Sequence, residues 1–397
     1  MLAQPGPKRG EGIAAVVHSI TTASPDRIAP VCRHFTQCGG CALQHWRAEP
    51  AAAWKAGLLG AALRRAGFAN IPLHPTITTP PGTRRRMDLA IHRAQAGKGG
   101  GAGGRLRLGL HQARGREVID LVECPVLDPA LAALIPPLRA LLSGLAVPRR
   151  EGSAIANLLD SGPDLLLRLD VEPNVDARQA LIAFARANDL PRLSWALGTG
   201  PAEPIVILRS PVTRLAGVAV NPAPGAFLQA SATGAAAITA AVLAGLPEKL
   251  PARATIAELY AGMGTLTLAL AARARVVAWE GDAEAVTTLR AAANGAGLAN
   301  RISITQRDLA RRPIPAKELA SVAAIVLDPP YAGAPAQMAD LAAARVARVI
   351  YVSCNPAALA RDAAILRAAG YRVLAATPID QFLWSPRLES VTVFARG

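Results

Sequence analysis

Apolar runs and helical stretches alternate along the last third of the chain. Helical stretches such as AEAVTTLRAAANGAG (283–297) separate five apolar runs, each with polar residues at its carboxyl end: ATIAELYAG (254–262), VVAWEGD (276–282), ISITQRD (302–308), ASVAAIVLDPP (320–330) and RVIYVSCNP (348–356). Strands that alternate with helices of this length predict a parallel, doubly wound sheet. Because right-handed crossovers bring the carboxyl ends to one edge, we expect a ligand site there.

The rest of the chain predicts two further regions, because 397 residues are too many for one ordinary domain. Residues 73–225 show shorter strands and turns, which predict a β-rich α+β domain. Residues 1–72 form a short N-terminal segment with most of the cysteines, and residues 226–397 carry the alternating pattern. The glycine-rich stretch 96–105 lies between two strand-like runs and predicts a flexible hairpin loop.

The charge of the chain indicates a polyanionic partner. The formal net charge is +15, and residues 1–130 hold seventeen Lys and Arg against eight Asp and Glu. A run such as Arg84-Arg85-Arg86 is usually a solvated face. No uncharged run reaches about 18 apolar residues, and the first twenty residues are too polar for a signal peptide. We therefore expect a cytoplasmic protein that contacts nucleic acid and no membrane.

Four of the five cysteines follow a ligand-like spacing. Cys32, Cys38 and Cys41 are close together, and Cys124 stands far downstream before Pro125. Thiolates select zinc or an iron–sulfur cluster, and spacing alone does not separate the two. The Cys-Pro pair favours a cluster over zinc, and a set of ordinary buried thiols is the remaining alternative.

The first apolar run leads into a glycine loop. Gly262 and Gly264 let the backbone turn tightly and approach a ligand at the start of the following helix. Glu280 ends the next strand, where a carboxylate can accept both hydroxyls of a ribose. Asp308 ends the third strand and can accept from an adenine amino group. Each acid has a plain alternative as a helix cap or a solvated loop residue.

Two later strand ends carry further reactive groups. Asp328 closes a strand before two prolines that stiffen the loop, a suitable place to hold a planar base. Cys354 lies between a strand and the helix opened by Asn355-Pro356. A thiol at a helix N-terminus is expected to have a depressed pKa and to act as a nucleophile. The alternatives are an ordinary turn at Asp328 and a buried structural cysteine at Cys354.

Together these motifs resemble the RNA 5-methyluridine methyltransferase family from about residue 24 to the C-terminus. The matching segments are SPDRIAPVCRHFTQCGGCALQHW (24–46), CPVLDP (124–129), FLQAS (227–231), YVSCNPAALARD (351–362) and RLESVTVFARG (387–397). SCNP with the glutamate of the last segment is highly specific, whereas the glycine loop is not.

The resemblance implies a fold and a set of roles. The fold is α/β, with a C-terminal Rossmann-like class I methyltransferase domain, a central mixed α+β domain and an N-terminal 4Fe-4S segment. Cys354 is implied as nucleophile and Glu389 as general base, and Asp328 as a hydrogen-bond partner of substrate or cofactor. The S-adenosylmethionine site is implied to include Gln229, Tyr260, Gly262, Gly264, Thr265, Glu280 and Asp308. The substrate is RNA, with 23S rRNA favoured over tRNA because of the cluster, and we expect a monomer.

Three features depart from the family pattern. The usual DPPR or DPAR is DPPY here, so Tyr331 replaces a basic side chain. The usual histidine two residues before the base is Arg387. Many members begin with a small all-β RNA-binding TRAM domain, and the 25–30 residues before the cysteine segment are too few for it. RNA affinity is then expected from the cysteine region and the central domain.

Three other functions compete with this interpretation. The DPPY tetrad resembles methyltransferases that act on exocyclic amino groups of bases, in which Cys354 and Glu389 would be idle. Methylation of uridine-54 in tRNA is a second alternative. A non-catalytic RNA-binding or redox-sensing cluster protein is the third, and a damaged cofactor motif or a missing nucleophile would favour it.

Overall fold

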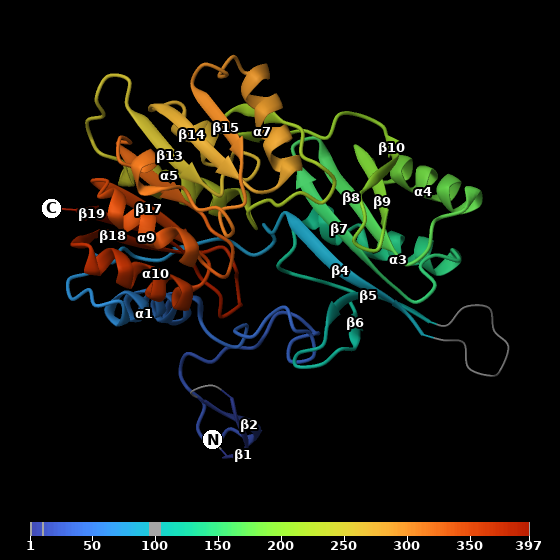
Figure 1. Cartoon of the computed structure of the whole chain (residues 1–397). Coiled ribbons are helices and arrows are strands. Elements are labelled where there is room, and N and C mark those ends of the chain that lie inside the picture. The colour runs from blue at the N-terminus through green and yellow to red at the C-terminus, as the bar shows by residue number, and fades with distance from the viewer. Residues whose placement is uncertain (1, 10–11, 95–104, 397) are drawn as a thin grey trace.

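The computed structural model describes residues 2–9, 12–94 and 105–396 and contains two large sheets (Figure 1). The first sheet has eight strands in the order β15-β14-β13-β16-β17-β19-β18-β3. These strands are β3 (Ile77–Thr78), β13 (Thr255–Leu259), β14 (Arg275–Glu280), β15 (Ile302–Gln306), β16 (Ala324–Leu327), β17 (Arg348–Ser353), β18 (Tyr371–Asp380) and β19 (Glu389–Arg396).

The five apolar runs singled out in the sequence form β13 to β17, and these strands are mutually parallel. The predicted doubly wound sheet is thus confirmed. After β13 the chain builds outward to β14 and β15 and then returns to place β16 on the other side of β13. This reversal is the position at which such sheets bind ligands. β19 runs antiparallel between β17 and β18 and completes the sheet.

Helices cover both faces of this sheet because its strands are apolar on both sides. In β16, Ala324 and Val326 pack on one face, and Ile325 and Leu327 on the other. The helices that lie along the sheet are α1 (Ala48–Arg65), α5 (Ala232–Gly245), α6 (Thr267–Leu270), α7 (Ala283–Gly295), α8 (Ala316–Leu319), α9 (Pro335–Ala344) and α10 (Pro356–Ala368).

The second sheet has seven strands, mostly antiparallel, in the order β10-β9-β8-β7-β4-β5-β6. Met87, Leu89 and Ile91 of β4 alternate into one core, whereas Asp88 is exposed, so the sheet buries one face against helices. Its elements are β4 (Arg86–Arg93), β5 (Leu106–His111), β6 (Val118–Asp120), α2 (Pro129–Ala132), α3 (Ile135–Gly144), β7 (Glu151–Leu159), β8 (Gly162–Leu169), α4 (Val175–Ala187), β9 (Arg192–Leu197) and β10 (Glu203–Ile207).

An irregular segment, residues 20–47, links the two sheets. Its backbone donates from Ala42 and Leu43 to the carbonyl of Trp384 at 2.8 and 2.9 Å, and Cys38 forms an isolated bridge with Gln112. The segment thus contacts the loop before β19 on one side and the second sheet on the other. Two small hairpins complete the fold: β1 (Leu2–Arg9) with β2 (Gly12–Ser19), and β11 (Thr213–Leu215) with β12 (Val218–Val220).

Helix α1 lies beside α10 on the outer face of the first sheet (Figure 1). The structure thus attaches this helix to the C-terminal region, although it precedes residue 72; the domain boundaries themselves stay predictions. The predicted hairpin loop at 96–105 lies, apart from Arg105, outside the described residues, and the flanking β4 and β5 pair antiparallel. Within the described residues, no helix is long and apolar enough to cross a membrane.

Candidate active site and cysteine cavity

The glycine loop after β13 stands at the reversal of strand order. Tyr260, Gly262 and Gly264 have φ angles of 63°, 56° and 101°. A Cβ on Gly264 would approach Leu289 to 2.4 Å, so only glycine fits there, whereas a Cβ on Gly262 would meet nothing within 4 Å. The backbone at Gly262 therefore faces open space, as a loop that approaches a cofactor requires. Thr265 follows directly and is half-buried.

The two acids after β14 and β15 lie near this loop. Glu280 accepts from the backbone of Gly262 at 2.7 Å and of Asp282 at 2.8 Å, so it shapes the loop itself. Asp308 stands two residues beyond β15 and accepts from the backbone of Ala310 at 3.0 Å. Burial, followed by the charges of Asp362, Asp308 and Glu280, raises the pKa of Tyr260 to about 12. The structure thus brings Tyr260 and both acids together.

A chain of four polar side chains joins the other predicted site residues. Asp328 accepts from the Gln229 amide nitrogen at 3.3 Å. The Gln381 amide nitrogen donates to the Gln229 amide oxygen at 2.8 Å and to Glu389 Oε2 at 2.9 Å. Gln381 also accepts from the backbone of Ala230 at 3.1 Å. Residues from three separate segments thus meet at the carboxyl edge of the sheet.

Glu389 is the first residue of β19 and is 4 % exposed. Its Oε1 is buried and has no hydrogen-bond partner among the described residues. Burial, followed by the charge of Asp328, raises the pKa of Glu389 to about 8, and burial raises that of Asp328 to about 7. A buried acceptor without a partner costs free energy, and this oxygen remains available to a ligand atom.

Cys354 lies beside this chain of polar groups, and the expected depression of its pKa is wrong for the substrate-free protein. Burial, followed by the charges of Glu389 and Asp328, raises the pKa of the thiol to about 11. The backbone and the charge of Arg387 act in the opposite direction. Desolvation and two carboxylates thus outweigh the helix N-terminus on which the expectation rested.

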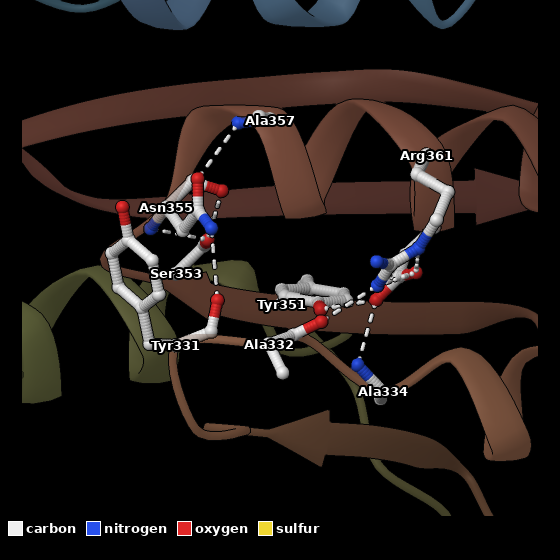
Figure 2. A network of polar contacts seen from close by, with 9 residues as sticks. Tyr331, Ala332, Ala334, Tyr351, Ser353, Asn355, Ala357 and Arg361 are labelled. Carbon is white, nitrogen blue, oxygen red and sulfur yellow. Dashed lines mark hydrogen bonds and ion pairs between the residues drawn. The ribbon is translucent and has the colours of Figure 1, made fainter.

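The loop after Asp328 is fixed by the residues that follow Cys354, as Figure 2 shows. Asn355 Nδ2 donates to the carbonyl of Tyr331 at 2.9 Å, and Arg361 donates to the carbonyl of Ala332 at 2.8 Å. Asp362 accepts from the backbone of Ala334 at 2.7 Å. The loop after Asp328 is therefore fastened to the helix that follows Cys354.

The four other cysteines line a single cavity of about 290 Å³ between the irregular segment and the second sheet. Burial raises the pKa of Cys38, Cys41 and Cys124, and the charges of the other thiols in the set raise each of them further. Cys32, Cys38, Cys41 and Cys124 are thus brought together. Within the described part of the chain, however, no group of three or more His, Cys, Asp or Glu side chains is arranged to hold a metal ion.

The arginine run is not the solvated face that the sequence suggested. Arg84, Arg85 and Arg86 are all half-buried, and burial lowers the pKa of each. Arg84 and Arg86 line the cysteine cavity, and Arg85 Nε donates to the carbonyl of Gln229 at 3.1 Å. The run therefore links the cavity to the candidate active site.

Sequence reasoning missed Gln381. It lies just beyond β18, in a loop without a helical or strand pattern, and its role depends on contacts with residues 152 and 8 positions away. The only signal was its nearness to the matched segment 387–397, which is too general to single out one glutamine.

Comparison with known proteins bears directly on this site. Residues 226–396 match the model of the tRNA (uracil-5-)-methyltransferase family. An uncharacterized RNA methyltransferase of Caulobacter vibrioides is 39% identical over 97% of this chain and 90% of its own length. The 23S rRNA (uracil(1939)-C(5))-methyltransferase of Edwardsiella ictaluri is 34% identical over 95% of this chain and 84% of its own length.

Among solved structures, the tRNA (uracil-54, C5)-methyltransferase of Pyrococcus abyssi, in complex with S-adenosyl-L-homocysteine, has a similar fold. Its TM-score is 0.69 at 19% identity, with 95% of this chain and 88% of that chain covered. The protein is an S-adenosylmethionine-dependent RNA methyltransferase. With relatives of this identity along nearly the whole chain, and with the strand-end site described above, it belongs to the RNA 5-methyluridine methyltransferase family.

Proposed function

We propose that this protein transfers a methyl group from S-adenosylmethionine to carbon 5 of a uridine in RNA, through a covalent bond between Cys354 and the uracil. The observation that carries the proposal is the pairing of Cys354 with Glu389, whose buried Oε1 has no partner. Both lie at the carboxyl edge of the sheet that also holds the glycine loop. A nucleophile and a base beside a cofactor loop are what this reaction needs.

The residues of the glycine loop fit S-adenosylmethionine, which supplies an electrophilic methyl group when bound. The open backbone at Gly262 leaves space for it. Tyr260, Thr265, Glu280 and Asp308 would complete its site, with Gln229 and Asp328 on the side of the substrate. Their grouping at the reversal of strand order supports these assignments.

Covalent catalysis is needed because carbon 5 of uracil is a weak nucleophile. Cys354 loses its proton and its sulfur bonds to carbon 6, which moves a pair of electrons onto oxygen 4 as an enolate. Carbon 5 then takes up the methyl group, whose bond to the sulfonium sulfur breaks, so that S-adenosylhomocysteine would be the leaving group. Glu389 removes the proton from carbon 5, the double bond re-forms, and the bond to sulfur breaks to release Cys354 as a thiolate.

The environment of Glu389 suits this order of steps. A carboxylate with a pKa raised to about 8 is a stronger base than an exposed glutamate. Gln381 donates to one of its oxygens and leaves the other free to accept the proton. The competing amino-methylation hypothesis gives neither Cys354 nor Glu389 a task.

For the substrate we propose 23S rRNA, with uridine-54 of tRNA as the alternative. The relative from Edwardsiella ictaluri, named for 23S rRNA, aligns along nearly the whole chain at 34% identity and supports the first. The matching family model and the Pyrococcus abyssi structure are both named for tRNA, and they support the tRNA alternative. Mapping 5-methyluridine in rRNA and tRNA from a knockout strain, against the complemented strain, distinguishes them.

We further propose that Cys32, Cys38, Cys41 and Cys124 hold a 4Fe-4S cluster. A tetrahedral zinc site brings its four sulfurs within about 3.8 Å of one another, given zinc–sulfur bonds of about 2.3 Å. No such compact group occurs in the described residues, although all four thiols face one cavity. The cavity that all four thiols line and the Cys124-Pro125 pair are the observations that support a cluster.

An RNA with 5-fluorouridine tests the proposed reaction directly. Fluorine at carbon 5 cannot be removed as a proton, so the thiolate mechanism stalls with protein and RNA covalently joined. We expect a shifted band on a denaturing gel that depends on S-adenosylmethionine and on Cys354. Turnover of natural RNA without any trapped complex would instead favour amino-methylation.

A further inference from the structure

Two of the three departures from the family pattern, Tyr331 and Arg387, contact each other in the structure. The guanidinium carbon of Arg387 lies 5.5 Å from the centre of the Tyr331 ring, within the range of a cation–π interaction. One departure removes a basic side chain from the loop after Asp328, and the other places an arginine before Glu389. The positive charge is thus retained at the site but comes from the opposite loop.

Tyr331 is held in a fixed position without being part of the core. Its carbonyl accepts from Asn355, the residue after Cys354, and the loop behind it is fastened by Arg361 and Asp362 (Figure 2). Its side chain is 58% exposed. A rigid backbone with an exposed ring provides a surface on which a guanidinium can stack.

Arg387 is free to act on a ligand or on the thiol. Its backbone donates to Ser385 Oγ at 3.2 Å, and its side chain is exposed. Among the described residues it forms no ion pair with a carboxylate, unlike Arg361 or Arg192. It also lines the cysteine cavity, so it stands between that cavity and the active site.

The active site requires such a cation. The charged groups that act on Cys354 are Glu389 from β19, Asp328 from the end of β16 and Arg387 from the loop before β19. The two carboxylates oppose formation of a thiolate, and only Arg387 among the three favours it. Addition to uracil also creates an enolate, so the negative charge persists through the reaction.

We propose that Arg387, oriented by the Tyr331 ring, supplies the positive charge that stabilises the Cys354 thiolate and the uracil enolate, in place of the basic residue that the family pattern has at position 331. The inference rests on the proposed function and deepens it. Arg387 balances the anion, and Tyr331 is a positioning residue that acts through Arg387.

The test measures the rate at which a covalent complex forms with 5-fluorouridine RNA between pH 6 and 9. Transcripts of 23S rRNA and tRNA made with 5-fluorouridine triphosphate serve as the probe. Because the pKa of Cys354 is raised to about 11, the rate at saturating RNA should rise with pH throughout this range. Arg387→Gln should displace the whole profile to a pH about one unit higher, which lowers the rate at pH 7 about tenfold. The direction follows because loss of a nearby cation makes the thiol harder to deprotonate.

Paired variants separate this role from a structural one. Tyr331→Leu should displace the pH–rate profile in the same direction by a smaller amount, and it should add nothing in the Arg387→Gln background. The double variant Tyr331→Arg/Arg387→His restores the family pattern and should return the rate to within about threefold of wild type. Arg178→Gln breaks a similar pair, with Arg178 5.4 Å from the Trp195 ring in the second sheet, and should leave the profile unchanged.

The outcomes distinguish the possible failures. If wild type forms no complex, the proposed function is wrong and this inference falls with it. If wild type forms the complex and Arg387→Gln keeps the wild-type profile at saturating RNA, the inference alone is overturned. A variant that needs more RNA for saturation but then shows the wild-type profile would show Arg387 to be a phosphate contact instead. If thermal unfolding shows that Arg387→Gln folds poorly, Arg387→Lys replaces it, because lysine keeps the charge and weakens the stacking. The pH–rate profile of Arg387→Lys should lie between those of wild type and Arg387→Gln.

Discussion

The active site and the cysteine cavity are built on different structural principles. The active site collects residues from the ends of β13, β14, β16 and β17 and the start of β19, and its buried polar groups largely satisfy one another through Gln229 and Gln381. The cavity collects Cys32, Cys38 and Cys41 from an irregular segment and Cys124 from a loop. Its thiols oppose each other's ionisation.

This difference indicates which of the two sites needs a bound group to hold its structure. Strand ends are fixed by the sheet, so the active site is formed before any ligand binds. The irregular segment belongs to neither large sheet and is held by its own turns and by contacts such as that of Ala42 with Trp384. A cluster would compensate the charge of four thiolates and fasten the segment. We therefore expect loss of the cluster to loosen the cavity far more than loss of substrate loosens the active site.

Replacement of Cys354 should have the largest effect. Cys354→Ala removes the nucleophile and should lower methylation by at least ~10³-fold, while S-adenosylmethionine binding stays nearly intact because the glycine loop is untouched. An assay of methyl transfer measures the activity, and a titration with S-adenosylmethionine measures the binding. Turnover within tenfold of wild type would exclude the thiolate mechanism and place amino-methylation first.

Removal of a cysteine from the cavity should have the next largest effect, and it should act on the cavity rather than on the active site. Cys124→Ser should bleach the brown colour of anaerobically purified protein and lower the iron content from about four per chain. The irregular segment should become sensitive to protease, since Cys124 joins it to the second sheet. Cys354→Ala is the matched control and should keep its iron. One zinc per chain without iron would show that the metal is wrong.

Loss of Gln381 should weaken the active site without destroying it. Gln381→Met breaks the bonds to Gln229 and Glu389, so the base loses its orientation and turnover should fall about tenfold. Gln337→Met is the control, because Gln337 is equally buried and bonds both backbone groups of Ile314. If both variants lose activity equally, Gln381 acts through stability alone.

Glu258 should affect stability rather than rate. It is buried in β13, its Oε2 has no partner, and burial raises its pKa to about 8 from an ordinary 4.5. In the native state Glu258 therefore keeps its proton to a higher pH than in the unfolded chain. Its contribution to the free energy of unfolding is fully present below pH 4.5 and is lost as the pH rises through 8. Glu258→Gln should match wild type at pH 5 and exceed its free energy of unfolding by roughly 2–5 kcal/mol at pH 9. Denaturant titration at both values checks this, and equal curves at pH 9 would contradict it.

The sequence predicted the sheet well because each of its strands is a local pattern. The apolar runs before Glu280, Asp328 and Cys354 fix both the strand and the edge at which its polar end emerges. The pKa of Cys354 could not be predicted in this way. It depends on Glu389 and Asp328, which the fold brings from 35 positions downstream and 26 upstream.

Contacts between loops were equally beyond local reasoning. Tyr331 and Arg387 could be identified as departures from the family pattern, but their contact follows from the antiparallel placement of β19 beside β17. The burial of Arg84–Arg86 likewise arises where β4 begins between the cavity and Gln229. A run of like charges in the sequence does not indicate that the fold will place it between the cysteine cavity and the active site.

The most direct test of the account is the product formed by Glu389→Gln. Glutamine keeps the shape of the side chain and removes the proton acceptor, and thiol addition and methyl transfer both precede loss of the proton from carbon 5. We predict one methyl transfer followed by a stall, seen as radiolabel from the methyl donor on a protein–RNA complex in a denaturing gel and absent from Cys354→Ala/Glu389→Gln. Normal turnover by Glu389→Gln, with no labelled complex, would contradict the assignment of Glu389 as the base.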